Sequence, residues 1–207
     1  MSPRGKKLNE EMRAEAIAKI TRAALVTFAE YGYHGASMEQ IMQASGLSKG
    51  LVYHYFPSKE ELFLHLVDSA FEISRNIWKE ALEAPGTAWE KIERLTDSLV
   101  KTTFTEESSL YFLIMVQATT QGRSIPGLMD YIIQRSVHFA ELPRLILEAQ
   151  KSGEAAPGDP NLLATTYIAL FQGFTLILSG DEAMKKKITP EIFTKLLRNP
   201  GKFNGKG

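Results

Sequence analysis

The chain has 207 residues, of which 44% are hydrophobic, and it contains eleven Phe, seven Tyr and two Trp. This composition excludes a disordered protein and is sufficient for one large core or for a small domain joined to a larger one. The chain has no Cys, which excludes disulfides, thiolate metal sites and cysteine nucleophiles, and its formal net charge is zero.

The charge is divided unevenly along the chain. Residues 1–59 contain eight Lys or Arg and five Asp or Glu, which gives +3, whereas the remainder contains sixteen and nineteen, which gives −3. The sign is the one expected if the N-terminal part binds an anionic polymer, although the difference is small. The first residues lack the apolar stretch of a signal peptide, so we expect a soluble cytoplasmic protein. We predict that residues 1–9 form a disordered basic leader.

The first predicted helix covers residues 10–31. Ile17, Ile20 and Phe28 recur there at helical spacing, and Gly32 follows as a residue that can end the helix. The apolar face of this helix can cover the short helices that come next.

A short helix is predicted from Ser37 to about Ala44. Ser37 and Gln40 have the spacing of a capping box, in which each residue bonds to the backbone of the other. Gly46 can adopt the positive φ that ends this helix and turns the chain sharply. The pattern therefore predicts a tight turn directly after the helix.

A second short helix is predicted between Ser48, which can cap it, and Pro57, which ends it. Leu51, Val52 and Tyr55 or Phe56 can point inward, and Lys49, Tyr53 and His54 can point outward. Ser58 and Glu61 form another capping box, which begins a long helix. Two short helices joined by such a turn are typical of a helix-turn-helix, whose second helix enters the DNA major groove.

Residues 28–63, with the sequence F-A-E-Y-G-Y-H-G-A-S-M-E-Q-I-M-Q-A-S-G-L-S-K-G-L-V-Y-H-Y-F-P-S-K-E-E-L-F, resemble the N-terminal domain of the TetR family of transcriptional regulators, and the likeness extends over about residues 10–65. The signature positions are Phe28, Gly32, Ile41, Gly46, Tyr53, Tyr55, Phe56, Lys59, Glu60 and Leu62. Leu51 departs from the family, because many members carry a small hydroxyl residue there that can reach a phosphate.

The remainder of the chain is predicted to be helical throughout, and no alternating strand pattern competes. The expected helices cover residues 58–83, 87–104, 106–121, 126–151, 160–179 and 189–198, with Gly- and Pro-containing segments between them. The resemblance implies an all-α protein with a DNA-binding domain over 1–57 and an effector-binding and dimerisation domain over 58–207. We expect the helix from Ser58 to belong to both domains.

Seven residues are predicted to contact DNA: Ser37, Ser48, Lys49, Gly50, Tyr53, His54 and Lys59. Tyr53 and Lys59 can reach phosphate oxygens, and Lys59 opposes the dipole of its own helix, a conflict that an external anion would remove. Lys49 and His54 can bond to base edges. Gly50 can let the helix approach the groove closely, although a crowded neighbour would also explain a glycine. Capping is a sufficient explanation for Ser37 and Ser48, but a helix N-terminus that points at a phosphate would let the same residues serve both roles.

Arg4, Lys6 and Lys7 offer an alternative to a disordered leader, because a basic N-terminal segment can lie over the minor groove.

A ligand cavity or a packed core would both use the aromatic and methionine residues of the larger domain. The candidate ligand-binding residues are Phe71, Trp78, Phe104, Tyr111, Phe112, Met115, Thr119, His138, Phe139 and Phe171. Polar residues on apolar helices, such as Gln117 and Gln172, favour a cavity, but satisfied core polar groups explain them almost equally well. The resemblance implies a small hydrophobic effector.

The stretch from Leu162 to Leu178 is the longest apolar one, and it falls short of the roughly 20 residues that span a membrane. It therefore favours a helix that is buried inside protein, and we predict that it forms the homodimer interface together with residues 189–198. The candidate interface residues are Leu162, Thr166, Ala169, Gly173, Leu176, Ile192 and Leu196.

Catalytic and metal-binding motifs are missing from the sequence. The four His lack the spacing of zinc ligands, and no phosphate-binding loop or nucleophile elbow is present. We therefore expect neither an enzyme nor a cofactor.

The leading hypothesis is a homodimeric repressor that binds a palindromic double-stranded DNA operator and is released by a small hydrophobic effector. The alternatives are a constitutive regulator without a ligand, and a helical carrier or enzyme that has lost DNA binding.

Overall fold

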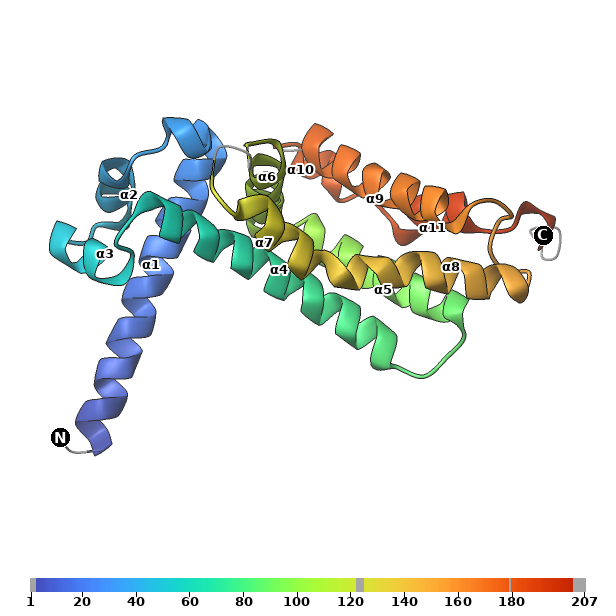
Figure 1. Cartoon of the computed structure of the whole chain (residues 1–207), viewed down its shortest axis with the longest axis horizontal. Helices are drawn as coiled ribbons and strands as arrows, with labels where there is room; N and C mark the ends of the chain where they lie inside the picture. The colour runs from blue at the N-terminus through green and yellow to red at the C-terminus, as the bar shows by residue number, and fades with distance from the viewer. Residues whose placement is uncertain (1–2, 122–124, 179, 203–207) are drawn as a thin grey trace. The chain divides into compact units, whose positions relative to one another are not determined.

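The protein is represented by a computed structural model that describes residues 3–121, 125–178 and 180–202 (Figure 1). These residues form helices and no strand, which confirms the predicted all-α fold class. The α-helices are α1 (Pro3–Gly35), α2 (Met38–Ser45), α3 (Lys49–Tyr55), α4 (Lys59–Glu83), α5 (Ala88–Thr103), α6 (Glu106–Gln121), α7 (Leu128–Arg135), α8 (Glu141–Lys151), α9 (Pro160–Ile177), α10 (Glu182–Lys185) and α11 (Pro190–Leu197). The described residues also include the short 3₁₀ helices η2 (Ser136–Ala140) and η3 (Pro200–Lys202).

Helix α1 begins earlier than predicted, because residues 3–9 are helical and not a disordered leader. An ion pair one turn apart, with 3.9 Å between Lys7 Nζ and Glu11 Oε1, supports this first part. Gly32 has φ 71° and ψ 167°, so it kinks α1 where a helix end was predicted. The side chains of Arg4 and Lys6 lie outside the described part of the chain.

The single helix predicted over residues 126–151 is wrong, because η2 separates α7 from α8. Pro143 gives the physical reason. It has no N–H to donate to the carbonyl of Phe139, and its fixed φ suits the first turn of a new helix. This proline is visible in the sequence, but the prediction of a single helix did not take it into account.

The chain forms two compact units. The first comprises Met1–Ala70 and Leu113–Met129, and the second comprises Phe71–Phe112 and Asp130–Gly207. Helices α4 and α6 therefore each contribute residues to both units. A functional boundary after residue 57 stays a prediction.

The core of the first unit joins α1, α2, α3 and α4. Ile20, Phe28, Ile41 and Val52 are fully buried, and the rings of Phe28 and Phe63 meet edge to face with centroids 5.2 Å apart. Burial of these side chains fixes the two short helices on α1 and α4.

The core of the second unit is an aromatic and aliphatic cluster from α4, α5, α8, α9 and α11. Its centre is Phe193, whose ring stacks on that of Phe171 with centroids 3.7 Å apart. Tyr167 is also buried, and its hydroxyl lies 2.7 Å from that of Thr96, which in turn donates to the Ile92 carbonyl. Burial raises the pKa of Tyr167, which therefore stays neutral. Because the Thr96 hydroxyl already donates to Ile92, the Tyr167 hydroxyl donates to Thr96. In the described parts of the chain, no helix combines the length and apolar character needed to cross a membrane.

Candidate DNA-binding surface

The turn between α2 and α3 has the predicted local chemistry. The Ser37 hydroxyl accepts a hydrogen bond from Gln40 N at 3.2 Å, and Gln40 Oε1 accepts one from Ser37 N at 2.8 Å. Gly46 has φ 68° and donates its N–H to the Met42 carbonyl. The capping box and the left-handed glycine are therefore confirmed, and together they set the angle at which α3 leaves α2.

Helix α3 has one buried face and one exposed face. Ser48 caps the helix by accepting a hydrogen bond from Leu51 N, and Val52 and Phe56 are buried. The exposed residues are Lys49, Gly50, Tyr53 and His54. Burial on one face thus holds the helix while the other presents cationic, aromatic and imidazole groups to solvent.

The exposed face of α3 is partly organised before any partner binds. The Lys49 ammonium lies 5.9 Å from the centroid of the Tyr53 ring, one turn further along the helix. The space around Gly50 is open. A Cβ atom built on this residue would have no other heavy atom within 4 Å. The crowded neighbour considered as an explanation for this glycine is therefore ruled out.

Lys59 has a structural role that the sequence did not predict. Its ammonium donates to the carbonyl oxygens of Tyr33 at 2.8 Å and Ala36 at 2.9 Å. The carbonyl groups near the end of α1 therefore supply the negative partner that was expected from an external anion. An ammonium has three donors, so one remains for a phosphate, and that contact stays a prediction.

Gln117 on α6 also contacts the end of α1. Its amide Nε2 donates to the Phe28 carbonyl at 2.8 Å, in the turn that precedes the kink at Gly32. In the sequence, Gln117 stands out only as a polar residue on an apolar helix, which fits a cavity or a satisfied core polar group. No local pattern predicts its actual partner, which lies 89 positions away in the sequence.

The candidate ligand-binding residues that the structure describes are divided between the two units. Trp78, Phe104, Phe139 and Phe171 belong to the second unit's hydrophobic cluster, and the rings of Trp78 and Phe139 meet with centroids 5.9 Å apart. Phe71 is buried, and Tyr111 and Phe112 are half-buried. Met115 and Thr119 belong to the first unit, and the Thr119 hydroxyl bonds to carbonyls of its own helix. The side chain of His138 lies outside the described residues.

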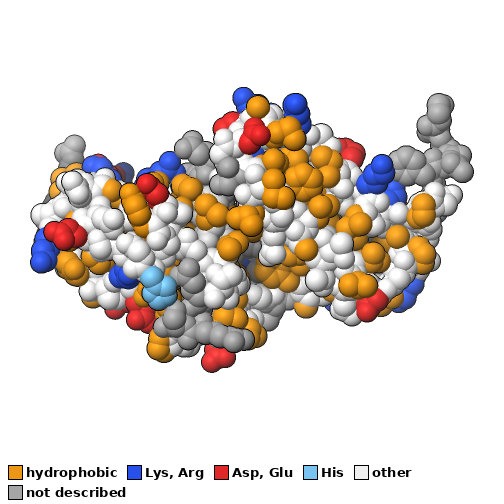
Figure 2. All heavy atoms as spheres, turned by 90° about the horizontal axis from the view of Figure 1, so that it is seen from above, with side chains coloured by type: hydrophobic (Ala, Val, Ile, Leu, Met, Phe, Trp, Pro, Cys, Tyr) orange, Lys and Arg blue, Asp and Glu red, His pale blue; other side chains and the backbone are white. Residues whose placement is uncertain are grey.

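The predicted dimer residues share an uncovered face on α9 and α11. Leu162 is 65% exposed and Leu176 is 54% exposed, and a Cβ atom at Gly173 would meet nothing within 4 Å. Thr166, Ala169, Ile192 and Leu196 are exposed as well, together with Ile177, which was not predicted. Figure 2 shows hydrophobic side chains gathered over α9. The opposite face of α9 is buried in the core through Tyr167 and Phe171.

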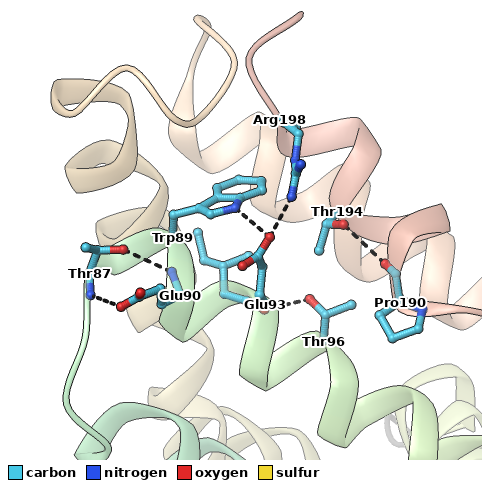
Figure 3. A network of polar contacts seen from close by, with 9 residues as sticks. Thr87, Trp89, Glu90, Glu93, Thr96, Pro190, Thr194 and Arg198 are labelled. Carbon is cyan, nitrogen blue, oxygen red and sulfur yellow. Dashed lines mark hydrogen bonds and ion pairs between the residues drawn. The ribbon is translucent and has the colours of Figure 1, made fainter. Parts of the chain in front are cut away.

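A polar network fixes the end of α11 (Figure 3). One carboxylate oxygen of Glu93 accepts hydrogen bonds from Arg198 Nη2 at 2.6 Å and from Trp89 Nε1 at 2.8 Å. The Arg198 guanidinium also lies 5.2 Å from the centroid of the Trp89 ring. Beside it, Ala156 N donates to the Leu197 carbonyl at 2.7 Å. These contacts hold α11 on α5 and on the loop before α9.

Residues 20–66 match the family described as bacterial regulatory proteins, tetR family. The HTH-type transcriptional regulator RutR of Escherichia coli K12 is 32% identical over 151 residues, which cover 70% of this chain and 66% of RutR. The chain therefore spans just under two thirds of the length of that relative. The HTH-type transcriptional regulator UidR of the same strain is 27% identical over 165 residues, or 78% of this chain and 81% of UidR.

Two solved structures share the fold. The TetR family transcriptional regulator PfmR from Thermus thermophilus has a TM-score of 0.73 at 23% identity, covering 87% of this chain and 98% of PfmR. A putative transcriptional regulator from Saccharomonospora viridis, solved in complex with choline, has a TM-score of 0.69 at 21% identity, covering 90% of this chain and all of that chain. At these identities the likeness concerns the fold alone.

Proposed function

Because this chain belongs to the TetR family of bacterial regulatory proteins, we propose that it is a transcriptional regulator that reads DNA with helix α3. The observation that carries the proposal is the exposed face of α3, where Lys49, Gly50, Tyr53 and His54 stand on a capped helix that is anchored by Val52 and Phe56. An exposed helix of this kind fits the major groove. The proposal includes the predicted cytoplasmic location, because operator DNA lies there.

The proposed active form is a homodimer. A single helix-turn-helix makes few base contacts, so useful specificity requires two half-sites about one helical turn, or a multiple of it, apart. The uncovered face of α9 and α11 supports a second copy of the chain as the partner. Single exposed leucines are common on monomeric proteins, but exposed apolar residues gathered on one face usually mark an interaction site. A two-fold pair predicts a palindromic operator.

The proposed signal is a small hydrophobic effector that relieves repression. Helices α4 and α6 each run through both units, so a ligand that shifts either helix in the second unit can change the first. Operator and effector then oppose each other by linkage. The close stacking of Phe171 on Phe193 favours a packed core at that point. A second unit without a ligand cavity would make the protein a constitutive regulator, which is the alternative proposal.

Selection of duplexes from a random pool tests the proposal. A transcriptional regulator of this kind enriches an inverted repeat, and its affinity for that repeat falls steeply as salt rises. Enrichment of no sequence over random DNA would instead support a helical carrier or enzyme. A thermal-shift screen with hydrophobic metabolites then separates a ligand-responsive from a constitutive regulator, because a ligand at 100 times its Kd adds about 2.7 kcal/mol.

A further inference from the structure

Gly50 is a glycine that the chain itself does not require. It is the second residue of α3, and it is exposed. It is not one of the described glycines that adopt a positive φ. A Cβ atom at this position would meet nothing within 4 Å. Neither backbone conformation nor packing within the chain therefore explains why the residue is glycine.

Two other glycines of the same unit have an evident structural reason. Gly32 and Gly46 adopt φ 71° and φ 68°, which side-chain-bearing residues rarely adopt. Gly50 instead occupies a helical position, where glycine is less favourable than alanine. Alanine would suit this helical position at least as well, so nothing within the described chain accounts for glycine there.

The surroundings of Gly50 define what can approach it. Residues three and four positions apart share one face of a helix, so Gly50 lies in line with Tyr53 and His54. Lys49 precedes it and extends toward the Tyr53 ring. Among these longer side chains, Gly50 presents only its Cα methylene at the level of the helix backbone. This is an apolar spot that lacks a side chain able to donate or accept a hydrogen bond.

One group of the major groove matches such a spot. The base edges there present nitrogen and oxygen donors and acceptors, and the largest apolar group among them is the 5-methyl group of thymine. We propose that Gly50 determines specificity by receiving the 5-methyl group of one thymine in each half-site. The inference rests on the proposed function, because it requires that α3 enter the major groove of an operator.

The first test replaces each thymine of the selected operator by uracil, which removes only the methyl group. The wild-type protein should lose about fourfold in affinity for each half-site at one thymine position, the loss expected for one buried methyl group. The other thymine positions should change the affinity less. If no uracil substitution weakens binding, or if the enriched operator has no constant thymine in its half-sites, the inference is overturned.

The second test uses Gly50→Ala, whose extra methyl group would occupy the place of the thymine methyl. This variant should unfold at the same or a higher urea concentration than the wild type, yet bind the operator at least about fivefold more weakly, because an added methyl group overpacks a close contact. Its affinity for random duplexes should not change. Gly35→Ala is the matched control, because Gly35 is exposed, lacks positive φ and lies outside α3, and it should bind as the wild type does.

The outcomes separate the two proposals. If no duplex is enriched from the random pool, the proposed function fails. If an inverted repeat is enriched and Gly50→Ala binds it as tightly as the wild type, the proposed function stands and the thymine contact is wrong.

Discussion

The ammonium of Lys59 lies 4.7 Å from the centroid of the Tyr33 ring and donates a hydrogen bond to the carbonyl oxygen of the same residue at 2.8 Å. The Lys59 ammonium opposes the dipole of α4, and the carbonyl oxygens at the end of α1 stabilise its positive charge. This contact ties the start of α4 to the kink beside the helix-turn-helix, so the residue supports the fold whether or not it reaches DNA.

Lys59→Ala is therefore expected to destabilise the protein. The variant removes two hydrogen bonds from a charged donor and leaves two carbonyls to find other partners, which should cost roughly 1 to 3 kcal/mol in the free energy of unfolding. Urea titration measures this loss, and Lys49→Ala, which removes an exposed lysine, serves as the control and should be close to neutral. An unchanged midpoint for Lys59→Ala would show that the two bonds contribute nothing to stability.

The phosphate contact predicted for Lys59 has a separate readout. Loss of one phosphate contact lowers the slope of log affinity against log salt concentration by about 0.9, equally for all duplexes. Anisotropy titrations at several salt concentrations, performed at a temperature where the variant is folded, measure the slope. An unchanged slope would leave Lys59 with the structural role alone.

Lys49→Ala should change specificity without changing the fold. Lys49 is exposed and can donate to guanine O6 and N7, so its removal should relax the preference at one base position by roughly 1 to 3 kcal/mol. Repeating the duplex selection with the variant measures this effect. A uniform loss of affinity over all sequences would assign Lys49 to phosphate instead.

His65 makes the first unit sensitive to acid. It is half-buried on α4 with its ring 5.2 Å from that of Phe56, and burial lowers its pKa while the Asp68 carboxylate opposes part of the shift. As the pH falls, the unfolded chain therefore takes up the proton before the folded chain does, and stability is lost progressively as the pH falls below the ordinary value of 6.5.

The variant His65→Phe keeps an aromatic ring beside Phe56 and should lose less stability over this pH range than the wild type. Urea unfolding at pH 7 and pH 5 gives the difference, and His54→Gln, at an exposed histidine, is the control. An equal loss in wild type and His65→Phe would assign the acid sensitivity to other groups.

The proposed dimer face makes a prediction about assembly. Leu176→Lys should yield a monomer, because an ammonium would be buried where two apolar faces meet. Leu147→Lys is the matched control, since Leu147 is a 44% exposed leucine of the same unit on α8. Sedimentation measures the mass of each variant, and a dimeric Leu176→Lys would place the interface elsewhere.

Local sequence signals predicted the helix-turn-helix well. The capping box of Ser37 and Gln40, the left-handed Gly46 and the end of α3 before Pro57 each depend on residues within a few positions of one another. Such local interactions can be predicted from a pattern of residues, because the free N–H and C=O groups at the ends of a helix can be satisfied in only a few ways.

The contacts that assemble these helices were not predictable in the same way. Lys59 and Tyr33 are 26 positions apart, Gln117 and Phe28 are 89 apart, and Arg198 and Glu93 are 105 apart. Each pair forms only after the helices pack, so the residue spacing carries no trace of it. The ligand candidates were least predictable, because apolar periodicity has the same form for a packed core and for a cavity.

The central claim is that the exposed face of α3 reads base sequence. Its most direct test is a competition titration of the selected operator against a scrambled duplex of the same length and composition, at one fixed salt concentration. The claim predicts that the operator binds at least about a thousandfold more tightly than the scrambled duplex. Equal affinity for the two duplexes would contradict it.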